Sequence, residues 1–143
     1  MPETVSTTPA EQTCWLPRHP RSPRAARQEL RSFLLPLLAG ESLLHVGELL
    51  VSELVTNAVR HARTPRGRLI FVRFQLLPDH ILRIEVHDAG NGKPTLRDAT
   101  TCSETGRGLL LLHQLAQSWG CSPRAGGVGK FVWCHVSPEA GAA

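Results

Sequence analysis

The stretch LLHVGELLVSELVTNAVRHA, from Leu43 to Ala62, is the natural starting point for the fold. It is too long for a β-strand, and when it is wound as an α-helix its apolar side chains occupy most of the circumference. A helix of this kind needs cover over much of its surface, which a β-sheet can provide. The stretch therefore predicts a long helix packed on a sheet.

A stripe of polar side chains interrupts the apolar surface of this helix. Its members recur at spacings of three and four residues: Glu53, Thr56, Asn57, Arg60 and His61. Residues at these spacings share one face of a helix. Taken alone, the stripe is most simply the solvated face of an amphipathic helix. A functional role for it needs support from other parts of the chain.

The residues after this helix alternate between apolar and polar, as β-strands do. Two such runs, about 68–77 and 81–87, are separated by Pro78-Asp79-His80 and predict an antiparallel hairpin. Further on, a helix is expected over about 107–119. Two short strands follow it, at about 121–124 and 128–136.

Before the long helix we expect a short extended piece over 13–17 and a helix over about 23–38, which Pro36 could end one turn earlier. This order of elements places helices on one face of a mainly antiparallel sheet, which is a two-layer α/β sandwich. We expect a single domain over residues 13–137. A disordered tail over 1–12 would precede it and a C-terminal tail over 138–143 would follow.

Composition narrows the functional classes. With 41% apolar and 20% charged residues, the chain has the composition of a soluble globular protein. It has neither a signal peptide nor an apolar run long enough to span a membrane, so we expect a cytoplasmic protein with no membrane partner. The four cysteines form no CxxC pair, and reduced thiols are therefore expected rather than a zinc site or a disulfide framework.

The net charge of +4 comes from 14 Arg and 2 Lys set against 12 acidic residues. A basic balance suits nucleic acid, a phosphorylated small molecule or an acidic protein partner. The sequence has no Tyr, no aromatic platform and no recognition helix. Direct binding to nucleic acid is therefore not expected.

Two glycine motifs border a segment, 89–108, that has lost apolar periodicity. Asp88 follows an apolar strand and is the first residue of DAGNG. Gly90 and Gly92 in this motif would let a flat ligand approach the backbone. A simple turn would use the same residues. Gly106-Arg107-Gly108 begins the third helix, where unpaired N–H groups favour an anion such as phosphate. A segment of this length favours a functional loop or lid.

Three elements in this order, ELVTNAVRHA on a helix, DAGNG after a strand and GRGLLLL opening a helix, resemble the N, G1 and G2 boxes of the GHKL ATPase superfamily. That superfamily includes gyrase-type topoisomerases, Hsp90 chaperones, histidine kinases and the small anti-sigma-factor serine kinases. Its Bergerat fold is the two-layer sandwich inferred above. The resemblance spans about 24–136 and implies that the ligand is ATP.

The resemblance also implies a role for individual residues. Asn57 would coordinate Mg²⁺ through its amide oxygen, Glu53 would act as general base toward the attacking hydroxyl or water, and Asp88 would accept a hydrogen bond from the adenine amino group. The other ATP contacts that the resemblance implies are Arg60, His61, Gly90, Gly92, Gly106, Arg107, Gly108 and Leu109. For Arg60 and His61, a solvent-exposed role is equally open.

Within the superfamily, the short chain and its N box are similar to the small serine kinases that bind sigma factors and are countered by anti-anti-sigma proteins. The closing GKFVW resembles the last strand of actinobacterial relatives, although Lys130 is not followed by the hydroxyl residue that the family often has. We expect a Mg-ATP-dependent serine/threonine protein kinase with a sigma factor and an anti-anti-sigma-like protein as partners, and a homodimer is possible. The alternative is an ATP- or ADP-loaded regulator that sequesters a partner without phosphotransfer.

Overall fold

The computed structural model describes residues 10–61, 69–88, 106–123 and 129–138. Within these ranges the chain forms α-helices, β-strands and one short 3-10 turn. In chain order they are β1 (Glu11–Pro17), α1 (Ser22–Leu34), α2 (Gly40–His61), β2 (Leu69–Leu77), η1 (Pro78–His80), β3 (Ile81–Asp88), α4 (Gly106–Leu115), β4 (Ser118–Pro123) and β5 (Lys130–Val136).

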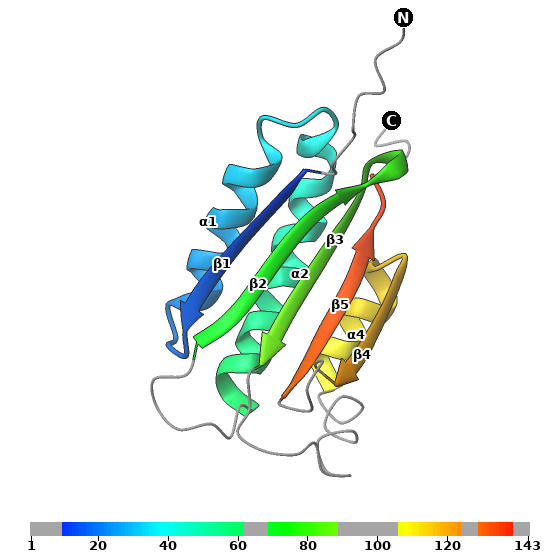
Figure 1. Cartoon of the computed structure of the whole chain (residues 1–143). Coiled ribbons are helices and arrows are strands. Elements are labelled where there is room, and N and C mark those ends of the chain that lie inside the picture. The colour runs from blue at the N-terminus through cyan, green and yellow to red at the C-terminus, as the bar shows by residue number, and fades with distance from the viewer. Residues whose placement is uncertain (1–9, 62–68, 89–105, 124–128, 139–143) are drawn as a thin grey trace, which may run out of the picture.

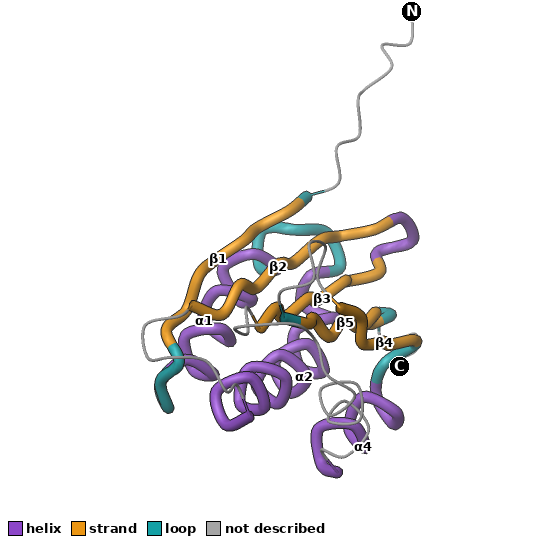
Figure 2. The backbone as a smooth tube through the Cα atoms, turned by 60° about the horizontal axis from the view of Figure 1, so that its bottom comes forward, coloured by secondary structure: helices purple, strands orange, loops and turns teal. Residues whose placement is uncertain are grey.

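The strands form one five-stranded sheet in the order β1-β2-β3-β5-β4. Each neighbouring pair is antiparallel. The three helices α1, α2 and α4 lie side by side on one face of this sheet, as Figure 1 shows from the opposite face. Figure 2 shows the helical layer and the sheet in a second view. The predicted two-layer α/β sandwich is confirmed.

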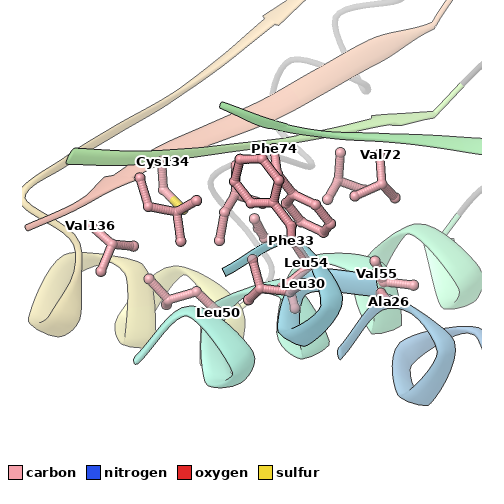
Figure 3. Close-up of a cluster of buried hydrophobic side chains, with 14 of the residues drawn as sticks. Ala26, Leu30, Phe33, Leu50, Leu54, Val55, Val72, Phe74, Cys134 and Val136 are labelled. Carbon is pink, nitrogen blue, oxygen red and sulfur yellow. The ribbon is translucent and has the colours of Figure 1, made fainter. Parts of the chain in front are cut away.

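The core lies between the two layers, and α2 contributes its central part. Leu50, Val51 and Val55 of α2 have no exposed surface, and Leu54 has only 4%. They pack with buried side chains of α1 such as Leu30 and with inward-facing residues of the strands (Figure 3). Burial of such side chains stabilises a fold by about 1.5 to 3 kcal/mol each, so this interface holds the layers together.

A glycine in the middle of α2 explains how closely the layers approach. A Cβ atom at Gly47 would lie 3.0 Å from Leu30 of α1 and 3.1 Å from Leu82 of β3. Both contacts are tighter than side chains usually tolerate. Gly47 therefore allows α2 to sit against its neighbouring helix and the sheet at the same point.

Several element boundaries differ from the expected ones, and the clearest cases are the following. Helix α1 ends at Leu34, because Pro36 cannot continue the helical hydrogen bonds. Helix α4 ends at Leu115 rather than at residue 119, because Ser118 already pairs with His135 of β5. Strand β1 begins at Glu11, which pairs with Gln75, two residues before the expected start of the domain.

The cysteines correct one expectation. Cys14 and Cys134 are free thiols, and Cys134 is fully buried. Cys121 is disulfide-bonded, so the expectation of reduced thiols is wrong for this residue. Spacing along the chain does not show which thiols meet in space, and this is why the sequence could not reveal the bond.

Within the described ranges, no helix combines the length and hydropathy needed to cross a membrane. No group of three or more His, Cys, Asp or Glu side chains in the same ranges is arranged to hold a metal ion.

Candidate functional site

The three predicted motifs converge on one end of the sandwich. Helix α2 ends there at His61, β3 ends there at Asp88, and α4 begins there at Gly106 (Figure 1). Strand β5 also starts at this end with Lys130. Motifs that are separated by many residues in sequence are therefore brought to one edge of the fold.

Helix α2 has two flanks on either side of its buried stripe, and α1 packs along one of them. There Arg27 Nη1 donates a hydrogen bond of 2.8 Å to Ser52 Oγ, and Arg31 Nη2 lies 2.8 Å from Glu48 Oε1. With 3.6 residues per helical turn, Glu53 and Asn57 fall on the opposite flank.

The flank of α2 that carries Glu53 and Asn57 is the one nearer to α4. The helices cover the sheet in the order α1, α2, α4 (Figure 2), and α4 contacts α2. Both side chains are half-buried. One helical turn separates them, so a carboxylate and an amide stand side by side at the border between α2 and α4.

The remaining members of the polar stripe lie farther from this border. Arg60 is exposed to solvent in the last turn of α2, and Thr56 is half-buried. His61 is the final residue of α2, and its side chain lies outside the described part of the chain. The structure thus brings Glu53 and Asn57 together and leaves Arg60 at the rim.

Asp88 is the last residue of β3 and faces the helical layer. Alternate residues of β3, such as Ile84 and Val86, are buried on that side, and Asp88 follows them in the same alternation. Its neighbours across the sheet are Ile70 of β2 and Lys130 of β5. Asp88 is therefore the last inward-facing residue of β3. It lies at the edge of the core, where a carboxylate can contact a ligand.

Lys130 is a residue of this end of the sandwich that sequence reasoning did not include in the site. It pairs with Asp88 on one side and with Pro123 of β4 on the other. The preceding Gly129 has a φ of 80°, a conformation that favours glycine. No pattern in the sequence showed that β5 lies next to β3, so the pairing of Lys130 with Asp88 could not be foreseen.

The first turn of α4 contains Gly106, Arg107, Gly108 and Leu109. No acidic residue stands in this turn of the helix. The backbone N–H groups at a helix start lack helical partners and carry a partial positive charge. The side chains of 106–109 lie outside the described ranges, as do Gly90, Gly92 and the expected lid over about 93–105.

The family assignment follows from comparison with known proteins. A family model described as a histidine kinase-like ATPase domain matches residues 16–134, which is most of the chain. This chain belongs to that family. The expected membership of the GHKL superfamily is confirmed, and the family implies ATP binding.

Two relatives from Erythrobacter litoralis show similarity over part of their length. Blue-light-activated histidine kinase 2 of strain HTCC2594 is 34% identical over 87 residues, which cover 59% of this chain and 25% of that protein. The solved histidine kinase domain of the EL346 blue-light activated histidine kinase is 26% identical, with a TM-score of 0.49. That comparison covers 68% of this chain and 45% of the solved chain. The chain thus spans about a quarter of the curated relative that it matches.

Proposed function

We propose that this chain binds Mg-ATP at the converged end of the sandwich and transfers the γ-phosphoryl group to a serine or threonine of an anti-anti-sigma-like protein, and so controls a sigma factor. The observation that carries the proposal is that α2, which bears Glu53 and Asn57, and β3, which ends at Asp88, finish at the end of the sandwich where α4 begins, on a chain of the histidine kinase-like ATPase family. The similarity of the N box to the small serine kinases supports the choice of substrate.

The base and the phosphates of ATP would bind different elements of this end. Asp88, at the edge of the core, would accept a hydrogen bond from the adenine amino group. The free N–H groups at the start of α4 would bind phosphate oxygens. Lys130, beside Asp88, adds a positive charge to this end of the sheet.

The α2 flank fits Mg²⁺ in its chemistry. Mg²⁺ takes oxygen ligands and usually combines one or two protein groups with phosphates and water. Asn57 offers a half-buried amide oxygen next to α4, where the phosphates would lie. When bound, the ion would neutralise negative charge on the phosphates.

Glu53 would serve as the general base for phosphoryl transfer. The substrate hydroxyl oxygen forms a bond to the γ-phosphorus while the bond from that phosphorus to the β–γ bridging oxygen breaks, and ADP leaves. Glu53 holds the hydroxyl and accepts its proton. Its position one turn before Asn57 on α2 supports this role, because the two side chains would then face the same phosphates.

The test is transfer of radiolabelled phosphate. The protein is mixed with γ-labelled ATP, Mg²⁺ and a candidate anti-anti-sigma protein, and label is measured on that protein's serine or threonine. We expect label with the unmodified chain and a loss of at least a hundredfold in Glu53→Ala, because a general base contributes about 10²–10⁴ in rate.

The matched control is Glu48→Ala on the same helix. Glu48 pairs with Arg31 on the flank that faces α1, so its loss should leave phosphotransfer unchanged. ATP binding in calorimetry without any label on the partner would instead favour the regulator that sequesters a partner without phosphotransfer. Absence of ATP binding would overturn both functions.

A further inference from the structure

Asp88 and Lys130 form a pair of opposite charges on the inner face of the sheet, where β3 ends and β5 begins. The two residues are direct cross-strand partners. Side chains of such partners lie on the same face of a sheet, with Cβ atoms about 4.5–5.5 Å apart. Along β5, Lys130 alternates in step with the buried Cys134 and Val136. Its side chain therefore points toward the helical layer, as that of Asp88 does.

The other charged residues of β2 and β3 lie on the helix-free face of the sheet and are paired with one another. Glu85 Oε2 lies 2.8 Å from Arg83 Nε, and Glu85 Oε1 lies 2.8 Å from His87 Nε2. Arg73 lies 3.8 Å from Glu85. The hydrogen bond from His87 and the nearby arginines lower the pKa of Glu85 to about 2, although burial opposes them.

Lys130 differs from these residues. Within the described ranges no ion pair involves its ammonium group, although Asp88 stands across from it. The side chain is half-buried, and a half-buried ammonium group needs hydrogen-bond acceptors. Its N–H donors are therefore available to a ligand at this end of the sandwich.

The surface beside the charged pair is apolar. Val86 and Val132 are the next inward-facing partners along β3 and β5, and Val86 is only 4% exposed. Ile70, which pairs with Asp88 from the β2 side, is 1% exposed. Apolar side chains with a few polar groups among them are the usual lining of a site for a small molecule. The pair thus stands where one edge of a flat base could meet it.

The edge of adenine offers a donor and an acceptor side by side. Its 6-amino group donates a hydrogen bond, and the neighbouring N1 accepts one. A carboxylate can only accept and an ammonium group can only donate, so Asp88 and Lys130 match this edge in one orientation. Guanine in the same orientation would present an oxygen to Asp88 and an N–H group to Lys130, and both contacts would be repulsive.

Charge balance also favours the pair as a site for a neutral base. Adenine is uncharged, so a carboxylate that lost water against it would have no compensating charge. A lysine on the neighbouring strand supplies that charge, which an uncharged side chain at position 130 could not do.

We infer that Lys130 determines the choice of base, by donating a hydrogen bond to N1 of adenine while Asp88 accepts one from the 6-amino group. The presence of ATP at this end of the sandwich is taken from the proposed function, on which the inference rests. Strand β5 would then contact the base directly. The charge of Lys130 still acts on the triphosphate through space, so a loss of ATP affinity alone does not identify the contact with N1.

Calorimetry with a base analogue tests this contact. In 1-deaza-ATP a C–H group replaces N1, and the rest of the nucleotide is unchanged. We expect the unmodified chain to bind this analogue at least about tenfold more weakly than ATP, since a hydrogen bond from a charged group is lost. Lys130→Met should bind both nucleotides with equal affinity, because the donor to N1 is gone. The two losses are then non-additive, as expected for groups in contact.

Two matched controls separate the base from the phosphates. 7-deaza-ATP keeps N1, so Lys130→Met should weaken the binding of 7-deaza-ATP and of ATP by the same factor. Arg24→Met removes an exposed positive charge from the first turn of α1, which follows the end of β1 at the same pole of the sheet. It should leave the preference for ATP over 1-deaza-ATP unchanged.

Equal binding of ATP and 1-deaza-ATP to the unmodified chain would overturn the inference, and this measurement needs no variant. A preference for ATP that persists in full in Lys130→Met would also overturn it. Thermal unfolding checks that Lys130→Met folds, and Lys130→Leu replaces it if it does not. A chain that binds no ATP at all would overturn the proposed function together with the inference.

Discussion

Asp88 and Lys130 are direct cross-strand partners at the end of the sheet where α2 finishes and α4 begins. They belong to β3 and β5, which are neighbours in the sheet although β4 lies between them in sequence. The carboxylate expected to recognise adenine therefore has a lysine beside it.

Lys130→Met should weaken ATP binding about tenfold, because it removes a positive charge from the end of the sheet that would receive a triphosphate. Lys130→Arg keeps the charge and should bind ATP within a few-fold of the unmodified chain. Isothermal titration calorimetry of the three proteins checks this expectation. Equal affinities for ATP in all three would place Lys130 outside the site.

Asn57→Ala should abolish Mg-dependent ATP binding and leave the fold intact. Asn57 is half-buried on the α4 side of α2 and lies beside the core rather than within it. Calorimetry with and without Mg²⁺, together with thermal unfolding, separates the two effects. Thr56→Ala, the adjacent position, serves as control. An unchanged ATP affinity in Asn57→Ala would remove this residue from the metal site.

Asp88→Asn should weaken adenine nucleotides and relax the preference for adenine over guanine. The replacement amide can present a donor to the adenine amino group, and that loses the hydrogen bond. Competition between ATP and GTP, measured for both proteins, provides the test. If the unmodified chain binds GTP as tightly as ATP, the role assigned to Asp88 is wrong.

Glu85→Gln should destabilise the protein at pH 7 by on the order of 3 kcal/mol, since one pKa unit corresponds to about 1.4 kcal/mol. The pKa of Glu85 falls from 4.5 to about 2 on folding. Its contribution is therefore complete above the unfolded pKa of 4.5 and is lost as the pH falls through about 2.

Urea unfolding at several pH values measures the effect of Glu85 on stability. The difference in free energy of unfolding between the unmodified chain and Glu85→Gln should shrink as the pH falls from 5 toward 2. A difference that stays constant over this range would mean that the Glu85 charge contributes nothing to stability.

The helices and the hairpin could be predicted because their patterns are local. The apolar periodicity of α2 and the turn at Pro78-Asp79-His80 each depend on residues close in sequence. The predicted ends of the elements were less accurate. At α4, for example, the pairing of Ser118 with His135 decides where the helix stops. A contact between distant segments outweighed the local helical pattern.

The row of rings on the helix-free face of the sheet and the position of Lys130 could not be predicted, because both depend on strand order. The sequence showed no aromatic platform, yet Trp15, Phe71 and Phe131 come together with His87 once four strands pair in register. The sequence correctly indicated the family and the two-layer fold. The roles of Glu53, Asn57 and Asp88 within it stay predictions.

The directions of β1 and β5 have a practical consequence for assays. β1 begins and β5 ends near the β2–β3 turn, since Ala10 accepts a hydrogen bond from Leu76 and Val136 pairs with Leu82. The nucleotide motifs lie at the other pole of the sheet (Figure 1). A fluorophore or surface tether attached ahead of β1 or beyond β5 would thus stand a full strand length from the nucleotide, and immobilised protein should still bind it.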